Sequence, residues 1–186
     1  MKANISPEPA LLGFLQDGPL HGYDLHKQVR AQLGVVWRLG QSQMYAILKE
    51  YETRGWIKTI VAPQTDRPAR KMLKLTPQGQ RAFDAWMNQS ARGLREFRVD
   101  FFARLYFAQA AGRRVLRTFL NQQIISTHEE LNALPQLGKD SEFAETVSSF
   151  RRAQLETILE WLTAYQAAET TRGARHPTGA KKRKNK

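Results

Sequence analysis

The sequence predicts a mainly α protein with one small two-stranded β hairpin, and three observations support this prediction. Apolar residues recur at helical spacing over most of the 186 residues. The spacing changes to an alternation of period two only between residues 57 and 75. Hydrophobic residues make up 41% of the chain, which is enough to bury a core.

The first quarter of the chain predicts three short helices separated by glycines. An Asp-Gly-Pro turn ends the first helix, Gly34 ends the second, and Gly55 follows the third in the position of a helix stop. Ser42 is a suitable N-cap for the third helix. The three helices are expected at about residues 9–16, 22–33 and 42–54.

A hairpin and a fourth helix follow. Residues 57–62 and 70–75 alternate as strands do, and the two prolines between them indicate a turn. Thr76-Pro77 then provides an N-cap and a first helical residue. Phe83 and Trp86 give the fourth helix a buried stripe.

The third helix has one apolar face and one face able to contact DNA. Met44, Leu48 and Tyr51 share the face expected to be buried. Glutamine can bond an adenine edge at two points, serine and tyrosine can reach phosphate or base, and lysine can hold a phosphate. An ordinary solvated face is an equally good explanation of this helix taken alone. The opposite face carries Gln41, Ser42, Gln43, Tyr45, Ala46 and Lys49.

The hairpin favours the DNA-binding alternative. It carries Arg67, Arg70 and Lys71, opposed by Asp66 alone. A projecting basic hairpin suits contact with the backbone or the minor groove beside a recognition helix. A charged hairpin also resists edge-to-edge aggregation, and both roles are compatible. These parts together predict a winged helix-turn-helix DNA-binding domain in residues 1–90.

Residues 11–87 also resemble the N-terminal domain of the PadR family of transcriptional regulators. The resemblance implies a DNA-binding regulator that represses transcription. Leu73 and Tyr51 are apolar departures from the family pattern, which put only local wing packing in doubt. The motifs that carry the resemblance are Leu12-Gly13, Leu20-His21-Gly22-Tyr23-Asp24-Leu25, Met44-Tyr45 with Leu48, Arg54-Gly55-Trp56-Ile57, Arg67-Pro68, Arg70-Lys71 and Leu75-Thr76-Pro77-Gln78-Gly79.

Residues 91–170 are predicted to form a helical dimerisation domain. A long last helix, about residues 141–168, carries apolar residues at near-heptad spacing, which needs a surface to pack on. Packing within one chain is the alternative. Trp161-Leu162 in this helix also resembles the longer PadR subgroup. Two-fold symmetry would place two recognition helices about 34 Å apart, which predicts a homodimer on a (pseudo)palindromic operator.

The net charge of +12 is unevenly distributed. Residues 1–90 contribute 12 basic and 7 acidic side chains, residues 91–170 contribute 10 of each, and residues 171–186 contribute 7 basic and none acidic. A polyanion is the natural partner of the charged parts, although a solubility charge is the alternative. We predict that residues 171–186 form a disordered basic tail that adds nonspecific phosphate contacts.

The resemblance further implies a small aromatic effector, which some family members bind between the two domains and others lack. A core role for the chain's aromatic residues is the favoured alternative. The residues expected at such a site are Trp37, Trp86, Phe97 and Phe101, with Trp56 and Tyr106 as further candidates.

Several classes of protein are excluded. The chain has no cysteine, which removes disulfides, thiolate metal sites and cysteine nucleophiles. Its four histidines are scattered, and no glycine-rich phosphate loop occurs, so we expect no enzyme, no cofactor and no metal. His21 is expected to help the turn before the second helix. No apolar run approaches the roughly 20 residues of a membrane span, so a cytoplasmic protein without a membrane partner is expected.

Overall fold

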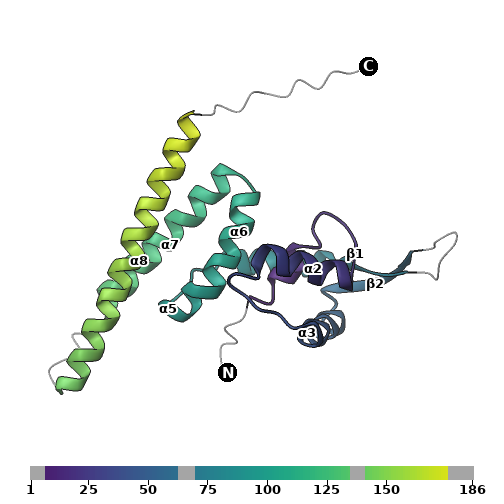
Figure 1. Ribbon diagram of the computed structural model, residues 1–186, viewed down its shortest axis with the longest axis horizontal. Helices are drawn as coiled ribbons and strands as arrows, with labels where there is room; N and C mark the ends of the chain where they lie inside the picture. Colours follow the sequence, from purple (N-terminus) through teal and green to yellow (C-terminus); the bar gives the residue numbers. More distant parts are fainter. Residues whose placement is uncertain (1–6, 63–69, 135–140, 176–186) are drawn as a thin grey trace. The chain divides into compact units, whose positions relative to one another are not determined.

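The computed structural model describes residues 7–62, 70–134 and 141–175. It divides into two compact units, Met1–Ala110 and Ala111–Lys186, which we call the winged-helix unit and the hairpin unit. The winged-helix unit contains α1 (Ala10–Gly13), β1 (Leu20–His21), α2 (Gly22–Leu33), α3 (Gln41–Thr53), β2 (Ile57–Ala62), β3 (Arg70–Leu75), α4 (Pro77–Met87), α5 (Gly93–Glu96), the π-helix η1 (Phe97–Phe101) and α6 (Phe102–Ala110) (Figure 1). The hairpin unit contains α7 (Arg113–Ala133) and α8 (Glu142–Arg175).

The sheet has three antiparallel strands in the order β1-β3-β2. Two of them form the predicted hairpin, in which Ile57 is opposite Leu75. The third strand, β1, places Leu20 opposite Leu73 and His21 opposite Met72. The prediction of a two-stranded wing missed β1, because two residues are too few to show an alternating pattern.

Side-chain caps fix where two helices begin. His21 Nδ1 accepts the backbone N–H of Tyr23 at 3.2 Å, which caps α2 and confirms the turn role expected for this histidine. Thr76 Oγ1 accepts the N–H of Gly79 at 3.1 Å, as predicted for the start of α4. The prediction of Ser42 as the N-cap of α3 was wrong. Gly40 is the N-cap, since its carbonyl accepts the first helical bond from Met44 at 2.9 Å.

One apolar core holds the winged-helix unit together. It contains residues of α1, α2, α3 and α4, and also two residues of α6, Ala103 and Phe107. The Phe107 ring contacts Phe14 at 5.3 Å and Phe83 at 5.2 Å between ring centroids. The packing division after Ala110 therefore differs from the predicted functional boundary between residues 90 and 91, which stays a prediction.

A buried polar cluster joins α4 to the segment that follows it. Arg104, 2% exposed, donates from Nη1 to the Gln89 carbonyl at 2.6 Å and from Nε to the Asp100 carbonyl at 3.3 Å. Trp86 Nε1 donates to Asp100 Oδ1 at 3.2 Å. Burial raises the pKa of the Asp100 carboxyl, against the opposing effects of the Trp86 bond and the Arg104 charge. Burial likewise lowers the pKa of Arg104. These bonds offset the free-energy cost of burying the polar groups of Arg104 and Asp100.

The hairpin unit is built from two long helices lying side by side (Figure 1). Buried residues of α7 such as Leu120, and of α8 such as Leu162, form the contact. The helix α8 continues to Arg175, past Thr171, where the sequence predicted the tail to begin. Arg172 and Glu169 support this extension with an ion pair of 2.8 Å across one turn.

Two kinds of feature are absent from the part of the chain that the structure describes. No described helix is both long and apolar enough to cross a membrane. No group of three or more histidine, aspartate or glutamate residues within the described ranges could hold a metal ion. Residues 63–69 and 176–186, which include Arg67 and most of the basic tail, lie outside the described ranges.

Candidate nucleic-acid interface

The helix α3 separates its residues into a buried face and a polar exposed face. Met44, Leu48 and Tyr51 are 0%, 4% and 3% exposed, so the predicted buried face is confirmed. Ile47 is buried as well, at 6%. Burial raises the pKa of the Tyr51 phenol, so this hydroxyl stays neutral. All the residues predicted to contact DNA from this helix are exposed: Gln41, Ser42, Gln43, Tyr45 and Lys49.

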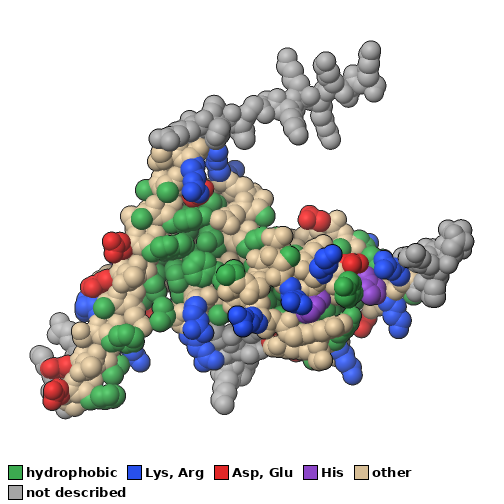
Figure 2. Space-filling model, in the orientation of Figure 1, with side chains coloured by type: hydrophobic (Ala, Val, Ile, Leu, Met, Phe, Trp, Pro, Cys, Tyr) green, Lys and Arg blue, Asp and Glu red, His purple; other side chains and the backbone are tan. Residues whose placement is uncertain are grey.

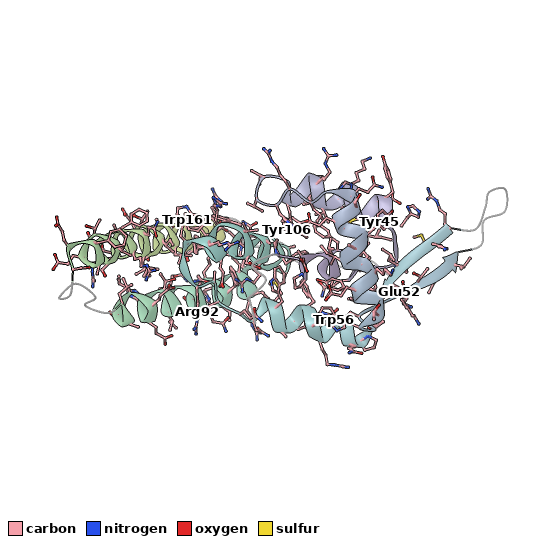
Figure 3. All side chains as sticks on the ribbon, turned by 90° about the horizontal axis from the view of Figure 1, so that it is seen from below. Tyr45, Glu52, Trp56, Arg92, Tyr106 and Trp161 are labelled. Carbon is pink, nitrogen blue, oxygen red and sulfur yellow. The ribbon has the colours of Figure 1, made fainter. Side chains whose placement is uncertain are left out.

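Tyr45, which is labelled in Figure 3, lies close to Gly22, the first residue of α2. A Cβ added to Gly22 would lie 2.9 Å from Tyr45 Oη and 3.0 Å from its Cε1, so only glycine allows this approach. The side chain of Tyr45 still has 44% of its surface exposed. Its ring is therefore supported on one side and open on the other, a suitable state for a rigid contact residue.

The acidic residues of α3 are engaged away from the start of the helix. Glu50 forms an ion pair with Arg54 one turn later. Glu52 Oε1 accepts the backbone N–H of Thr59 at 3.3 Å, which ties the end of α3 to β2. Negative charge is thus concentrated in the C-terminal half of α3, while the N-terminal half offers donors and acceptors without repelling phosphate.

The wing residues Arg70 and Lys71 are the first two residues of β3, and both are exposed. Arg70 is opposite Ala62, and Lys71 is opposite Val61. Because neighbours in a strand point to opposite faces, the two cations leave the wing on different sides. Arg67, the third predicted wing contact, lies outside the described residues.

A basic surface on α2 was missed by the sequence reasoning. Tyr23, Lys27 and Arg30 are exposed at spacings of four and three residues, and so share one face. Figure 2 shows Lys and Arg side chains over this helix, near a histidine. The sequence does carry a signal for this surface, since these positions alternate with the buried Leu25 and Val29, but the prediction for this helix rests on its apolar residues alone.

A groove links this surface to the start of α3. The His26 ring nitrogen Nε2 lies 3.0 Å from the Leu39 carbonyl oxygen, which fixes the loop between α2 and α3. The groove places two guanidinium groups, those of Arg30 and Arg38, beside the first residue of the predicted recognition helix. It has a volume of about 660 Å³ and is lined by His26, Arg30, Gly34, Trp37, Arg38, Leu39, Gly40 and Gln41.

The four residues expected at an effector site are buried. Trp37, Trp86, Phe97 and Phe101 are 8%, 6%, 7% and 0% exposed. Phe97 and Phe101 stack on one another within η1, with ring centroids 4.1 Å apart. Trp37 lines the groove beside α3. Of the further candidates, Tyr106 stacks on Phe14 at 5.8 Å. These contacts agree with the favoured alternative, in which the aromatic residues serve the core.

The model of the "Transcriptional regulator PadR-like family" matches residues 11–85. The "Negative transcriptional regulator PadR" of Bacillus subtilis is 26% identical over 125 residues, which cover 67% of this chain and 69% of that protein.

Two solved structures show a weaker likeness. Bacillus subtilis PadR in complex with operator DNA has a TM-score of 0.44 and 22% identity, covering 87% of this chain and 96% of that one. The protein smu.1604c from Streptococcus mutans has a TM-score of 0.43 and 20% identity, covering 87% and 99%.

Proposed function

We propose that this chain, a member of the PadR-like family of transcriptional regulators, acts as a homodimeric repressor on a (pseudo)palindromic operator. The observation that carries the proposal is the exposed face of α3, where residues 41–49 offer hydrogen-bonding side chains and no acidic group. The name of the Bacillus subtilis relative, a negative transcriptional regulator, supports repression as the sign.

In this proposal α3 enters the major groove. Gln41 and Gln43 would read base edges, since an amide can bond adenine at two points. Ser42 and Tyr45 would contact base or phosphate, and Lys49 would contact phosphate. The support of the Tyr45 ring by Gly22 favours this role, because a side chain held in place loses little entropy on binding.

Cations around α3 would contact the DNA backbone. Arg67, Arg70 and Lys71 of the wing are proposed phosphate contacts on one side. Arg30 of α2 is added to them because it is exposed and lines the groove that ends at α3, and Lys27 because it is exposed on the same face of α2. Helices preceding a recognition helix commonly cross the DNA backbone.

A gel-shift series tests the DNA interface with fragments upstream of the chain's own gene. Gln43→Ala and Tyr45→Ala should each weaken binding by about 5- to 100-fold, as expected for the loss of one base contact. Gln122→Ala on α7 is the matched control, since Gln122 is also an exposed glutamine. Affinity unchanged in both α3 variants would refute the assignment of direct readout.

The salt dependence separates backbone contacts from base contacts. Arg70→Gln and Lys71→Gln should each reduce the slope of log affinity against log salt by about 0.9, and weaken binding to all sequences alike. A variant that changes the preferred sequence while keeping the slope would contradict a phosphate role for that residue.

The homodimer proposal rests on an apolar stripe of α8 that the hairpin unit leaves exposed. Phe143, Phe150 and Trp161 are 78%, 63% and 38% exposed. Phe150 and Trp161 follow Phe143 by 7 and 18 residues, which are close to whole numbers of helical turns. All three residues therefore lie on one side of α8. The buried residues Leu155 and Leu162 lie on the side that contacts α7.

An antiparallel pairing of this stripe with a second copy fits best. With the two-fold axis between residues 155 and 156, Phe150 is opposite Trp161, Val147 is opposite Ala164, and Phe143 is opposite Ala168. Large residues then meet small ones in two of these three pairs, which fills a seam well. A parallel pairing would instead place each aromatic against its own copy.

The charges at the two ends of the hairpin unit also favour the antiparallel arrangement. One end carries Glu129, Glu130, Glu142 and Glu145, and the other carries Arg113, Arg114 and Arg117. Antiparallel copies place ends of opposite charge together, whereas parallel copies place like charges together.

Cysteine cross-linking tests both the dimer and its register, because the chain has no native cysteine. Chains with Val147→Cys mixed with chains with Ala164→Cys should form a disulfide-linked dimer under mild oxidation. A mixture of Glu156→Cys with Ala164→Cys is the control and should not. A dimer in solution without the predicted cross-link would refute the register, and a monomer would refute the homodimer.

Release of the operator by a small aromatic compound is the remaining part of the proposal. The position of Trp37 in the groove beside α3 supports it, because a ligand there would contact the start of the recognition helix. Titration of the protein–DNA complex with phenolic acids should release DNA and change tryptophan fluorescence. A complex that stays intact at saturating concentrations of these compounds would oppose this part alone.

A further inference from the structure

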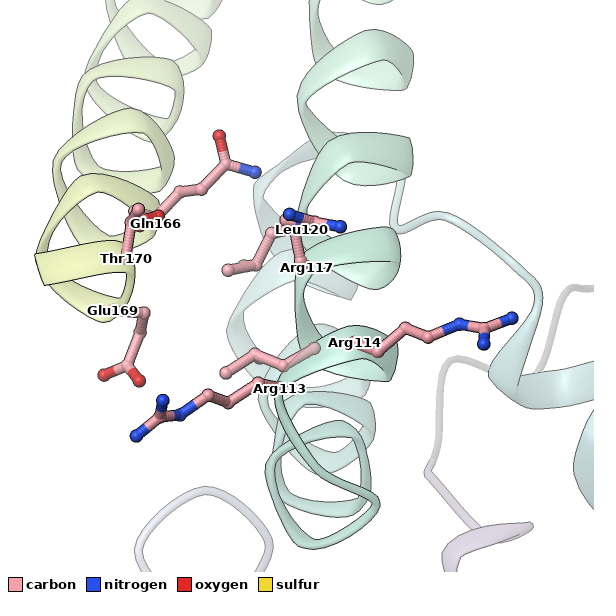
Figure 4. Close-up of a pocket in the computed structure, with 8 residues that line it drawn as sticks. Arg113, Arg114, Arg117, Leu120, Gln166, Glu169 and Thr170 are labelled. Atoms are coloured by element: carbon pink, nitrogen blue, oxygen red, sulfur yellow. The ribbon is translucent and has the colours of Figure 1, made fainter. Parts of the chain in front are cut away.

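The hairpin unit contains a cavity of about 300 Å³ between the start of α7 and the end of α8 (Figure 4). Four of its lining residues, at positions 113, 116, 117 and 120, follow helical spacing and so share one face of α7. The α8 side is formed by Gln166, Glu169 and Thr170. All lining residues belong to this unit, so the cavity is complete within it.

The floor of the cavity is apolar. Leu116 and Leu120 line it and are 5% and 1% exposed. The volume is at the lower end of the range of small-molecule sites, and twice that of a cavity known to accept a benzene-sized molecule, about 150 Å³. A compact apolar group could therefore bury much of its surface on the two leucines.

The rim of the cavity is cationic. Arg113, Arg114 and Arg117 line it, and the first turn of α7 holds no acidic residue. Glu169, the one acidic lining residue, forms an ion pair with Arg172 at 2.8 Å. Figure 4 shows Arg114 pointing away from α8, while Arg113 reaches toward Glu169. Arg113 and Arg117 are thus the cations on the cavity's own face of α7.

We propose that this cavity binds a small organic anion, namely a carboxylate carried on a compact apolar body. A guanidinium group pairs with a carboxylate through two parallel hydrogen bonds, which an alcohol cannot match. The leucine floor would bind the apolar body, which a bare anion lacks.

The site would be separate from the aromatic residues expected to bind an effector, and it does not depend on DNA binding. Its first lining residue, Arg113, directly follows Gly112, which has a φ of +98° and lies within the hairpin unit. An occupant would therefore contact the first turn of α7.

Isothermal titration calorimetry of the full chain without DNA tests the proposal with three compounds. Octanoate carries both the carboxylate and an apolar body, octan-1-ol lacks the charge, and acetate lacks the body. We expect octanoate to bind at one site per chain, and both other compounds to bind at least about tenfold more weakly. Failure of octanoate to bind, or equal binding of octan-1-ol, would overturn the proposal.

Substitutions then locate the site. The double variant Arg113→Gln/Arg117→Gln should weaken octanoate binding by at least about tenfold. Arg151→Gln, on an exposed arginine of α8 that does not line the cavity, should leave it unchanged. An equal loss in both variants would indicate general attraction to a basic protein and would overturn the site. Circular dichroism of each variant checks its folding. If the unsubstituted chain is folded and binds DNA normally but does not bind octanoate, this proposal alone is rejected.

Discussion

Replacing Gly22 with alanine should weaken operator binding without unfolding the protein, because the new methyl group would displace Tyr45. The added Cβ would lie 2.9 Å from Tyr45 Oη and 3.0 Å from Cε1, well inside the roughly 3.5 Å at which carbon atoms pack favourably. The ring is 44% exposed, so it can move outward instead of straining the core. Alanine is also a better helix residue than glycine, by up to about 1 kcal/mol.

The free energy of unfolding should consequently change by less than about 1 kcal/mol, while operator affinity falls by about 5- to 100-fold, the value of one lost contact. A double-mutant cycle separates this route from others. If Gly22→Ala acts through the tyrosine, it should have little further effect on affinity in a Tyr45→Ala background. Gel shifts give the affinities, and urea unfolding gives the stabilities. Gln28→Ala, at another exposed position of α2, is the control for a substitution in this helix.

Two results would refute this reasoning. If Gly22→Ala and Tyr45→Ala weakened binding additively, the glycine would act independently of the ring. If Gly22→Ala kept full affinity while Tyr45→Ala lost it, the position of the ring against α2 would not matter for binding.

Three further predictions concern stability. Gly79→Ala should destabilise the protein by about 1–3 kcal/mol or more, because its Cβ would lie 2.0 Å from the Trp56 carbonyl oxygen, which also bonds to Thr76. Thermal unfolding measures this loss, and a value below about 1 kcal/mol would contradict the prediction. Asp100→Asn should remove one source of pH dependence from the free energy of unfolding. Burial raises the pKa of Asp100 above 3.8, so the folded chain holds this proton to higher pH than the unfolded chain does. The stability of the native chain relative to the variant should therefore fall as pH rises from about 4 through the raised pKa. Urea unfolding at several pH values checks the sign, and a relative stability that rises with pH would refute it. A fragment ending at residue 110 should unfold cooperatively. A fragment ending at residue 90 lacks Phe107, and its free energy of unfolding should be lower by at least about 3–5 kcal/mol. Equal melting temperatures of the two fragments by circular dichroism would rule this out.

Local chemistry made much of the winged-helix unit predictable from its sequence. Thr76-Pro77 specified the start of α4, because its cap needs only residues adjacent in the chain. Met44, Leu48 and Tyr51 specified the buried face of α3 through their spacing alone. Ser42 was a wrong N-cap because both it and Gly40 suit that position, and the choice between them depends on which carbonyl accepts the first helical bond.

The parts that could not be predicted depend on contacts between distant segments. The strand β1 exists because Leu20 and His21 pair with a strand about 50 residues later, and two residues show no periodicity of their own. The support of Tyr45 by Gly22 likewise joins two helices. Gly22 belongs to a motif that carries the family resemblance. The physical reason for a glycine at this position, room for the Tyr45 ring, is visible only in three dimensions.

The position of the domain boundary shows why a polar segment is a poor guide to where packing ends. Residues 89–96 are polar and contain a glycine, which indicates a junction in the sequence. Yet Arg104 is buried and bonds back to the Gln89 carbonyl, and Phe107 packs on the rings of Phe14 and Phe83. A charged residue in the core cannot be anticipated from hydrophobicity, because its burial depends on bonds to a carbonyl far along the chain. The core of the DNA-binding unit is therefore completed by α6, a helix from the segment assigned to dimerisation. A displacement of α6 would therefore disturb the apolar core of the winged-helix unit itself, because Ala103 and Phe107 belong to that core.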